Sequence, residues 1–208
     1  MPYIFSAKVE EVNMARKVFF SFHYERDVWR AMVVRNSWVT KPDREAVGFI
    51  DAAEFEKLKR QGDLAIKRWI NSQLKGTSVT VVLIGAETFM RRWVRYEIVK
   101  SFDKKNGLLG IYIHKIKDKD GNRDLKGENP FDYVGVYIDK KGKTLYCEWN
   151  GSKWVKFKDY PNCSLKFPEI YWTGKIYTFQ VKLYDWVEED GYNNMGNWIE
   201  EAAKRVGR

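Results

Sequence analysis

The amino-acid sequence predicts an α/β protein with a flavodoxin-like, doubly wound parallel sheet and an inserted antiparallel β meander. Short runs of β-forming residues alternate with helical patterns up to residue 113, and these runs are apolar almost throughout. Strands covered by helices on both faces have this composition, and strand–helix alternation gives parallel pairing with right-handed crossovers. After residue 115 the pattern changes to short β-prone runs separated by Lys-Lys-Gly and Asn-Gly-Ser, which predicts the meander.

Four strands of the parallel sheet are expected in the first half of the chain, at residues 18–22, 47–50, 79–84 and 108–113. A last strand, residues 176–181, alternates in polarity and is expected to rejoin this sheet. In the doubly wound strand order 2-1-3-4-5, the loops after the first and third strands border a crevice. Open α/β sheets bind their ligands at such a crevice.

Helical patterns follow the strands. Asp27 is expected to cap a helix that ends near Arg35. Asp51 begins a capping box, Asp63 starts another helix, and a closing helix is expected over residues 197–206. The side chains expected to face the core are Val28, Trp29, Met32 and Val33 from the first of these helices, and Ile66, Trp69, Ile70 and Leu74 from the helix that starts at Asp63.

The chain is expected to form a single domain over residues 14–208, preceded by an extension at residues 1–13. Its parallel core would comprise residues 16–115 and 176–208, and the meander would be an insertion at residues 116–175. A length of 208 residues with 44% hydrophobic content suits one such domain.

The charge pattern favours an anionic ligand or surface without specifying one. The formal net charge is +9, but basic residues are scattered among acidic ones. No zinc-finger spacing, RNP-type aromatic motif or long basic arm is present, so nucleic acid is not an expected partner.

The two cysteines, Cys147 and Cys163, lack a paired spacing, which is typical of free thiols in a reducing cytosol. His23 and His114 are too far apart in the chain to suggest a metal motif, and we expect no metal. No apolar run approaches a membrane span, and the N-terminus lacks a secretory pattern. We therefore expect a cytoplasmic protein that makes no membrane contact.

The segment 91–100 carries the strongest functional pattern. Val94, Ile98 and Phe102 recur every four residues and predict a helix with one apolar stripe. Trp93 and Glu97 share a neighbouring row, just past the end of a buried strand. Spacing alone leaves their role open, because a carboxylate near a helix start is usually solvated and a tryptophan there usually packs.

The order of elements resembles a TIR domain over residues 17–113, about half of the chain. In that family a serine followed by an aromatic residue closes the first strand, as Ser21-Phe22 does, and a Trp-x-x-x-Glu motif opens the helix after the third strand, as Trp93 and Glu97 do. The chain is more closely similar to the TIR-like ThsB proteins of the bacterial Thoeris anti-phage system. The segments that carry this likeness are residues 16–24, 36–41, 91–97, 184–187 and 190–192.

The resemblance implies a flavodoxin-like/TIR-like fold and an enzyme that cleaves NAD, its substrate, without a cofactor. Nicotinamide would leave, and a cyclic ADP-ribose isomer would serve as a second messenger for a separate effector after a phage-derived activator acts. Glu97 would stabilise the developing oxocarbenium ion, and Trp93 would stack on a flat ring. Arg92 or Arg95 would hold the pyrophosphate. The residues expected to bind substrate are Phe22, His23, Tyr24, Asp51, Arg92 and Trp93.

Two other interpretations stay open at this stage. One is a non-enzymatic TIR-like adaptor that binds protein partners, and the other is a basic nucleic-acid binder. In a plainer interpretation of the site, Phe22 and His23 cap the core and the arginines are solvated. Release of nicotinamide separates the enzyme from both alternatives. Salt-sensitive binding to duplex DNA would favour the nucleic-acid binder.

Overall fold

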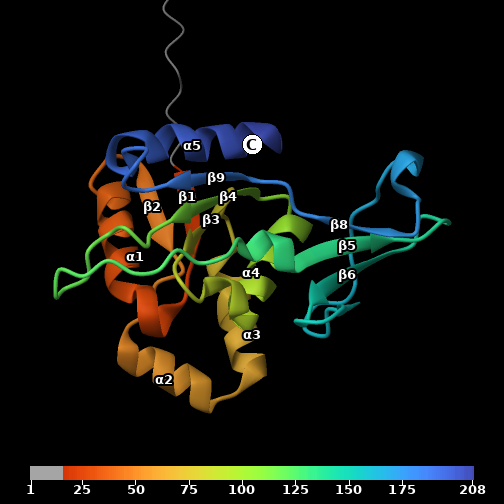
Figure 1. The fold of residues 1–208 in the computed structure, drawn as a ribbon, viewed down its shortest axis with the longest axis horizontal. Helices are drawn as coiled ribbons and strands as arrows, with labels where there is room; N and C mark the ends of the chain where they lie inside the picture. The colour runs from red at the N-terminus through yellow and green to blue at the C-terminus, as the bar shows by residue number, and fades with distance from the viewer. Residues whose placement is uncertain (1–15) are drawn as a thin grey trace, which may run out of the picture.

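The computed structural model describes residues 16–208, so the extension expected at residues 1–13 lies outside the described residues. Its main sheet has five parallel strands in the order β2-β1-β3-β4-β9 (Figure 1). In chain order these strands are β1 (Arg16–Ser21), β2 (Arg44–Val47), β3 (Val79–Ile84), β4 (Gly107–Tyr112) and β9 (Lys182–Asp185). The predicted doubly wound parallel sheet is confirmed.

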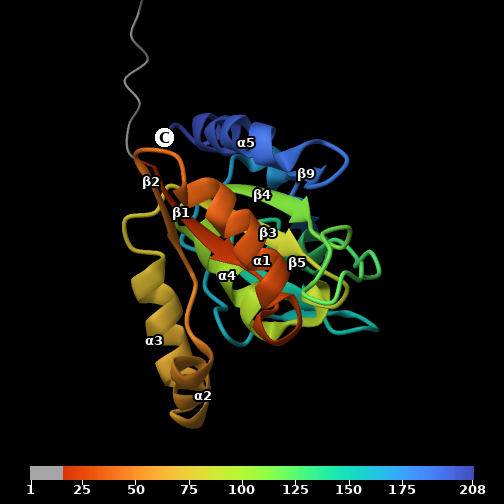
Figure 2. The same ribbon diagram turned by 90° about the vertical axis from the view of Figure 1, so that its left-hand side faces the viewer.

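Helices cover both faces of this sheet. The helices are α1 (Tyr24–Val39), α2 (Ala52–Arg60), α3 (Asp63–Gln73), α4 (Arg92–Asp103) and α5 (Gly191–Arg205). The core on one face is formed with α1 and α5, and the core on the other with α3 and α4. Figure 2 shows α2 and α3 extending together away from the sheet. The helices that follow β1 and β3 therefore leave on opposite faces, and the crevice lies between them.

The meander forms a second sheet of four antiparallel strands in the order β7-β6-β5-β8. Its strands are β5 (Val134–Ile138), β6 (Thr144–Trp149), β7 (Trp154–Lys156) and β8 (Lys175–Thr178). Three short 3-10 helices, η1 (Thr88–Met90), η2 (Pro130–Tyr133) and η3 (Glu169–Tyr171), complete the described elements.

The prediction that residues 176–181 rejoin the main sheet is wrong. The first half of this segment, residues 176–178, lies in β8, which pairs antiparallel with β5. The last strand of the main sheet is β9, which begins at Lys182 and runs parallel to β4. Alternating polarity suits an edge strand of either sheet, so the pattern did not distinguish the two. Phe179, just after β8, is buried and stacks on Phe102 of α4. At this contact the chain leaves the second sheet and returns to the main sheet.

The inward face predicted for α1 is also wrong. Trp29 and Val33 are 51% and 39% exposed, whereas Asp27 and Arg30 are buried. The helix starts at Tyr24, with His23 rather than Asp27 at its N-cap. Arg30 can be buried because its guanidinium donates to the Ile116 and Asn122 carbonyl oxygens of a long surface loop. Polar side chains thus occupy the stripe that hydrophobicity would assign to apolar ones: Arg30 is hydrogen-bonded there, whereas both carboxylate oxygens of Asp27 are buried without a hydrogen-bond partner among the described residues.

Other element boundaries also differ from expectation, among them the end of α1, which lies at Val39 rather than near Arg35. The second strand was expected at residues 47–50 but ends at Val47, because Gly48 takes a φ of 96° and packs tightly against the Phe20 carbonyl oxygen. A Cβ at Gly48 would lie 2.3 Å from that oxygen, so this turn requires glycine. The closing helix begins at Gly191 rather than at residue 197. The prediction missed its first turns because they are mostly polar and show no apolar stripe in the sequence.

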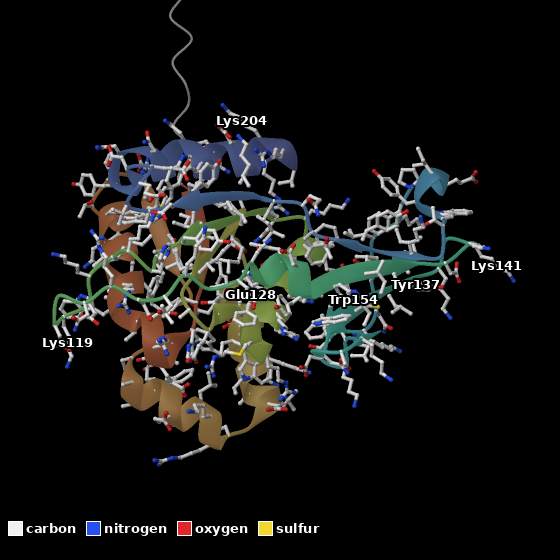
Figure 3. The ribbon with its side chains drawn as sticks, in the orientation of Figure 1. Lys119, Glu128, Tyr137, Lys141, Trp154 and Lys204 are labelled. Carbon is white, nitrogen blue, oxygen red and sulfur yellow. The ribbon has the colours of Figure 1, made fainter. Side chains whose placement is uncertain are left out.

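Ion pairs attach the second sheet to the outer side of α4. Arg92 makes two 2.7 Å hydrogen bonds to the Asp159 carboxylate. Arg95 donates to Glu148 and to the Trp149 carbonyl oxygen. At the other end of the inserted segment, the loop before the second sheet lies along α1. Figure 3 shows Lys119 in that loop and Lys141 in the β5–β6 turn at opposite ends of the molecule.

Within residues 16–208, no helix combines the length and the apolar character needed to cross a membrane.

The corrected face of α1 predicts unequal effects of two tryptophan substitutions. Trp38 is 1% exposed and its indole donates to the Glu45 carbonyl oxygen, so Trp38→Ala should lower the free energy of unfolding by about 3–5 kcal/mol. Trp29→Ala should change it by less than ~1 kcal/mol, since that ring is largely exposed. Urea unfolding of both variants tests this, and equal losses would contradict the assignment of the buried face.

Candidate active site

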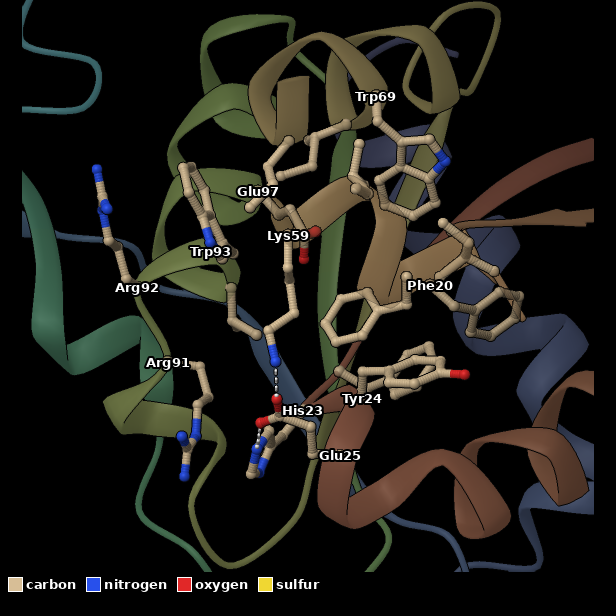
Figure 4. Close-up of a pocket in the computed structure, with 18 of the residues that line it drawn as sticks. Phe20, His23, Tyr24, Glu25, Lys59, Trp69, Arg91, Arg92, Trp93 and Glu97 are labelled. Carbon is tan, nitrogen blue, oxygen red and sulfur yellow. Dashed lines mark hydrogen bonds and ion pairs between the residues drawn. The ribbon is translucent and has the colours of Figure 1, made fainter. Parts of the chain in front are cut away.

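A pocket of about 390 Å³ opens at the carboxyl end of β1 (Figure 4). Its walls come from the loop after β1, from α2 and α3, and from the start of α4. This size and a largely apolar lining with a few polar groups are typical of a small-molecule site. The residues predicted from the sequence that line it are Phe22, His23, Tyr24, Arg92, Trp93 and Glu97.

Glu97 is the buried acid of this pocket. It lies in the second turn of α4, is 8% exposed, and makes no ion pair within residues 16–208. The Ser21 hydroxyl, at the end of β1, donates a 2.5 Å hydrogen bond to Glu97 Oε2. The pKa of Glu97 is raised to about 8, because burial raises it by more than the Ser21 hydrogen bond lowers it. The carboxyl group is therefore not the solvated residue of an ordinary helix start.

Trp93 lies on the same row of α4, one turn before Glu97. It is partly buried in the pocket wall, with the Arg92 guanidinium 4.5 Å from its ring centroid. Tyr96, next to Glu97 in the chain, is buried on another side of the helix, where it packs edge-on against Tyr160. The sequence spacing therefore selected two of the four α4 residues that line the pocket, of which the others are Arg92 and Val94.

The expectation that Trp69 belongs to the core holds only in part, because Trp69 packs against the core but also lines the pocket. Ile66, Ile70 and Leu74 form the buried stripe of α3, whereas Trp69 is only partly buried and lines the pocket. Figure 4 shows Trp69 and Trp93 on two walls of the pocket with Glu97 between them. The pocket therefore offers two large aromatic surfaces rather than one.

The arginines are arranged differently from the expectation. Arg92 lines the pocket, but its guanidinium is held by Asp159 and by Asp63. Arg95 faces the second sheet and is not part of the pocket lining. The sequence did not single out Arg91, which does line the pocket and pairs with Glu87. Its Nε atom is buried without a hydrogen-bond partner, so it keeps an unused donor.

A chain of polar contacts crosses one side of the pocket. Lys59 of α2 donates to Glu25 at 2.7 Å, and the other Glu25 oxygen lies 3.4 Å from His23 Nε2. Burial, and next the nearby positive charge of Arg91, lower the pKa of His23. Lys59 and Glu25 were not predicted. Lys59 lies on α2, which has no buried residue, and only the fold brings α2 to the β1 loop and to Glu25.

Aromatic rings from the β1 loop complete the wall. Tyr24 packs on Phe55 of α2 with ring centroids 4.3 Å apart, and Phe22 packs on Phe49 at 5.1 Å. Asp51, by contrast, is exposed and is not part of the pocket lining. Its side chain accepts the Glu54 backbone N–H, so it caps α2 as the capping-box pattern predicted.

The geometry provides a single unpaired carboxyl group among aromatic walls, with cationic side chains at the margin. Glu25, the other acid of the lining, is already paired with Lys59. Across residues 16–208, no group of three or more His, Cys, Asp or Glu side chains is arranged to hold a metal ion. This arrangement can stabilise a positive charge that develops on a ligand held between the rings.

Comparisons with known proteins agree with this geometry. Residues 19–118 match the family model described as "Thoeris protein ThsB, TIR-like domain". A Bacillus cereus (strain MSX-D12) protein named "Putative cyclic ADP-D-ribose synthase ThsB1" is 48% identical over 192 residues, which cover 89% of this chain and 100% of that protein. The chain belongs to the ThsB family of TIR-like proteins. The ThsB family match includes Glu97 and Trp93, whereas the second sheet lies beyond the matched residues.

The buried carboxyl group predicts an unusual dependence of stability on pH. In the unfolded chain Glu97 loses its proton near pH 4.5, whereas in the folded protein it keeps the proton up to about pH 8. Between these values the folded state binds more protons, so the free energy of unfolding falls as pH rises. Glu97→Gln removes this loss. Its free energy of unfolding relative to that of wild type should therefore increase by on the order of 1–3 kcal/mol from about pH 5 to about pH 8.

Urea unfolding at both pH values measures this gain. Glu54→Gln is the matched control, because Glu54 is exposed on α2. A difference between Glu97→Gln and wild type that stays constant with pH would show that Glu97 ionises normally.

Proposed function

We propose that this ThsB-family protein cleaves NAD at the nicotinamide–ribose bond, releases nicotinamide, and closes the remaining ADP-ribose into a cyclic isomer that signals in anti-phage defence. The family match and the name of the 48% identical relative support this function. The single observation that carries it is the Glu97 carboxyl group, buried without an ion pair in a pocket lined by Trp93.

The chemistry needs one carboxylate and no acid. When the bond between C1 of the ribose and the nicotinamide nitrogen breaks, its electron pair leaves with the ring, which becomes neutral. Positive charge then develops on the ribose, and an ionised Glu97 beside C1 stabilises it. The substrate itself favours this ionised state, because the nicotinamide ring of NAD carries a positive charge before cleavage.

Cyclisation requires that water does not reach C1 first. The pocket walls are largely apolar, with Trp69 on one side and Trp93 on another. Such walls exclude water and hold the two ring systems of NAD close together. A nucleophilic atom elsewhere in the same molecule can then attack C1 and close the ring. Arg91 lines the pocket and keeps an Nε donor without a hydrogen-bond partner, which supports it as the cation that binds the diphosphate.

The proposal extends to two protein partners. The cyclic product would carry the signal to a separate effector protein, and a phage-derived component would switch the enzyme on. The second sheet is where we place the contact with this activator. Arg92 and Arg95 bind side chains of the inserted segment and lie on α4, the helix that carries Glu97. A shift of the sheet would therefore move α4 and change the position of Glu97 in the pocket.

The adaptor interpretation fits the pocket less well. A protein that only binds partners has no need for a buried carboxyl group without a cation, because such a group lowers stability. Active sites, in contrast, are where such groups occur.

Glu97→Gln keeps the shape of the side chain but removes its charge. We expect nicotinamide release by the purified, folded variant to fall on the order of a hundredfold or more, because the charge acts mainly in the transition state. The assay uses extract from phage-infected cells to supply the trigger. Glu54→Gln should keep wild-type activity, since its exposed carboxylate lies outside the pocket lining. Near-normal release by Glu97→Gln would favour the adaptor.

A further inference from the structure

Within residues 16–208, Ser21 is the residue whose side chain forms a hydrogen bond with the Glu97 side chain. It is the last residue of β1, a strand paired on both sides with β2 and β3, and it is 1% exposed. Its Oγ lies 2.5 Å from Glu97 Oε2. Because β1 is an interior strand of the sheet and Ser21 pairs with Val82 of β3, the backbone that carries this donor is fixed against the carboxyl group.

We propose that Ser21 is a positioning residue for the reaction, whose hydroxyl holds one oxygen of Glu97, favours the ionised form of the carboxyl group, and leaves the other oxygen to face the ribose. The catalytic part rests on the proposed function, whereas the coupling between the two side chains rests on their contact alone. No role follows for Ser21 from the Trp-x-x-x-Glu pattern, which lies on a different element.

The other charged groups around the pocket do not replace this donor. The loop after β1 and the first turn of α1 contribute His23 and Glu25, α2 contributes Lys59, and the start of α4 contributes Arg91 and Arg92. The residues that α3 presents, Ile66, Trp69 and Ile70, carry no charge.

These groups already have their own partners. Lys59 pairs with Glu25, and Glu25 contacts His23. Arg91 pairs with Glu87, and Arg92 with Asp63 and Asp159. Burial and the Ser21 hydroxyl are the two influences on the pKa of Glu97, and they act in opposite directions. A hydroxyl that donates to a carboxylate stabilises the ionised form, so Ser21 offsets part of the effect of burial.

The test is the pH profile of nicotinamide release by Ser21→Ala. Without the donor, the ionised form of Glu97 is less stable, so the rise of kcat/KM with pH should move upward by about one unit or more, which corresponds to ~1.4 kcal/mol. Activity should be low at neutral pH and should recover at higher pH. Ser21→Thr keeps the hydroxyl and should keep the wild-type profile.

Ser101→Ala provides the matched control. Ser101 is also fully buried and lies on α4, but its hydroxyl bonds to Thr80 at 2.8 Å. This variant loses a buried hydroxyl without touching Glu97. It should therefore show the wild-type pH profile even where its thermal stability falls as much as that of Ser21→Ala.

A second readout does not depend on activity. NMR titration of protein labelled with ¹³C at the glutamate carboxyl carbon, with Glu97→Gln to assign the signal, gives the midpoint of Glu97 directly. The midpoint should be higher in Ser21→Ala than in wild type and Ser101→Ala. An unchanged midpoint in folded Ser21→Ala, or a loss of activity that is equal at all pH values, would overturn the proposal. Failure of the proposed function is a distinct result, in which triggered wild type releases no nicotinamide at any pH.

Discussion

The contact between Ser21 and Glu97 joins the end of β1 to the second turn of α4, and the geometry of the pocket depends on it. A doubly wound sheet brings these two elements together because the helices after β1 and β3 leave on opposite faces. The contact places an acid where water is scarce, and burial raises its pKa to about 8. Such a group lowers stability, so the surrounding fold must hold it in place.

The second sheet contributes to that support. Its inner side chains Val134, Val136 and Tyr146 belong to the same hydrophobic core as Val94 and Ile98 of α4. Farther along α4, the Asp103 carboxylate accepts hydrogen bonds from the hydroxyls of Tyr146, Tyr160 and Ser164. The helix is therefore fixed on its inner side by the parallel sheet and on its outer side by the insertion. An element in contact with both is suited to transmit a change from the insertion to the pocket.

Much of this architecture could be predicted from the sequence, because burial on both faces makes a strand continuously apolar, as in β3. The pairing of Trp93 with Glu97 also followed from spacing, since helical periodicity fixes which side chains share a row. Predictions failed where polarity and burial do not coincide. Asp27 and Arg30 are buried on α1, whereas Trp29 is exposed. Trp69 was assigned to the core alone because a partly buried ring at the edge of an apolar stripe looks like core in the sequence.

The remaining members of the site depend on tertiary contacts that no local pattern encodes. Lys59 lies on a helix without a buried residue and reaches the pocket because α2 folds over the β1 loop. Arg91 looked equivalent to Arg92 and Arg95 in the sequence. The structure separates them because Asp159 and Glu148 of the insertion bind the latter two.

Mass spectrometry of nucleotides from phage-infected cells tests the account most directly. Cells that express this chain or its Glu97→Gln variant at equal protein levels are sampled through the infection, and NAD, nicotinamide and cyclic ADP-ribose isomers are quantified. The account predicts that wild type loses NAD and accumulates a cyclic isomer, whereas the variant does neither. Equal accumulation of the cyclic isomer in both would contradict a catalytic role for the buried carboxylate.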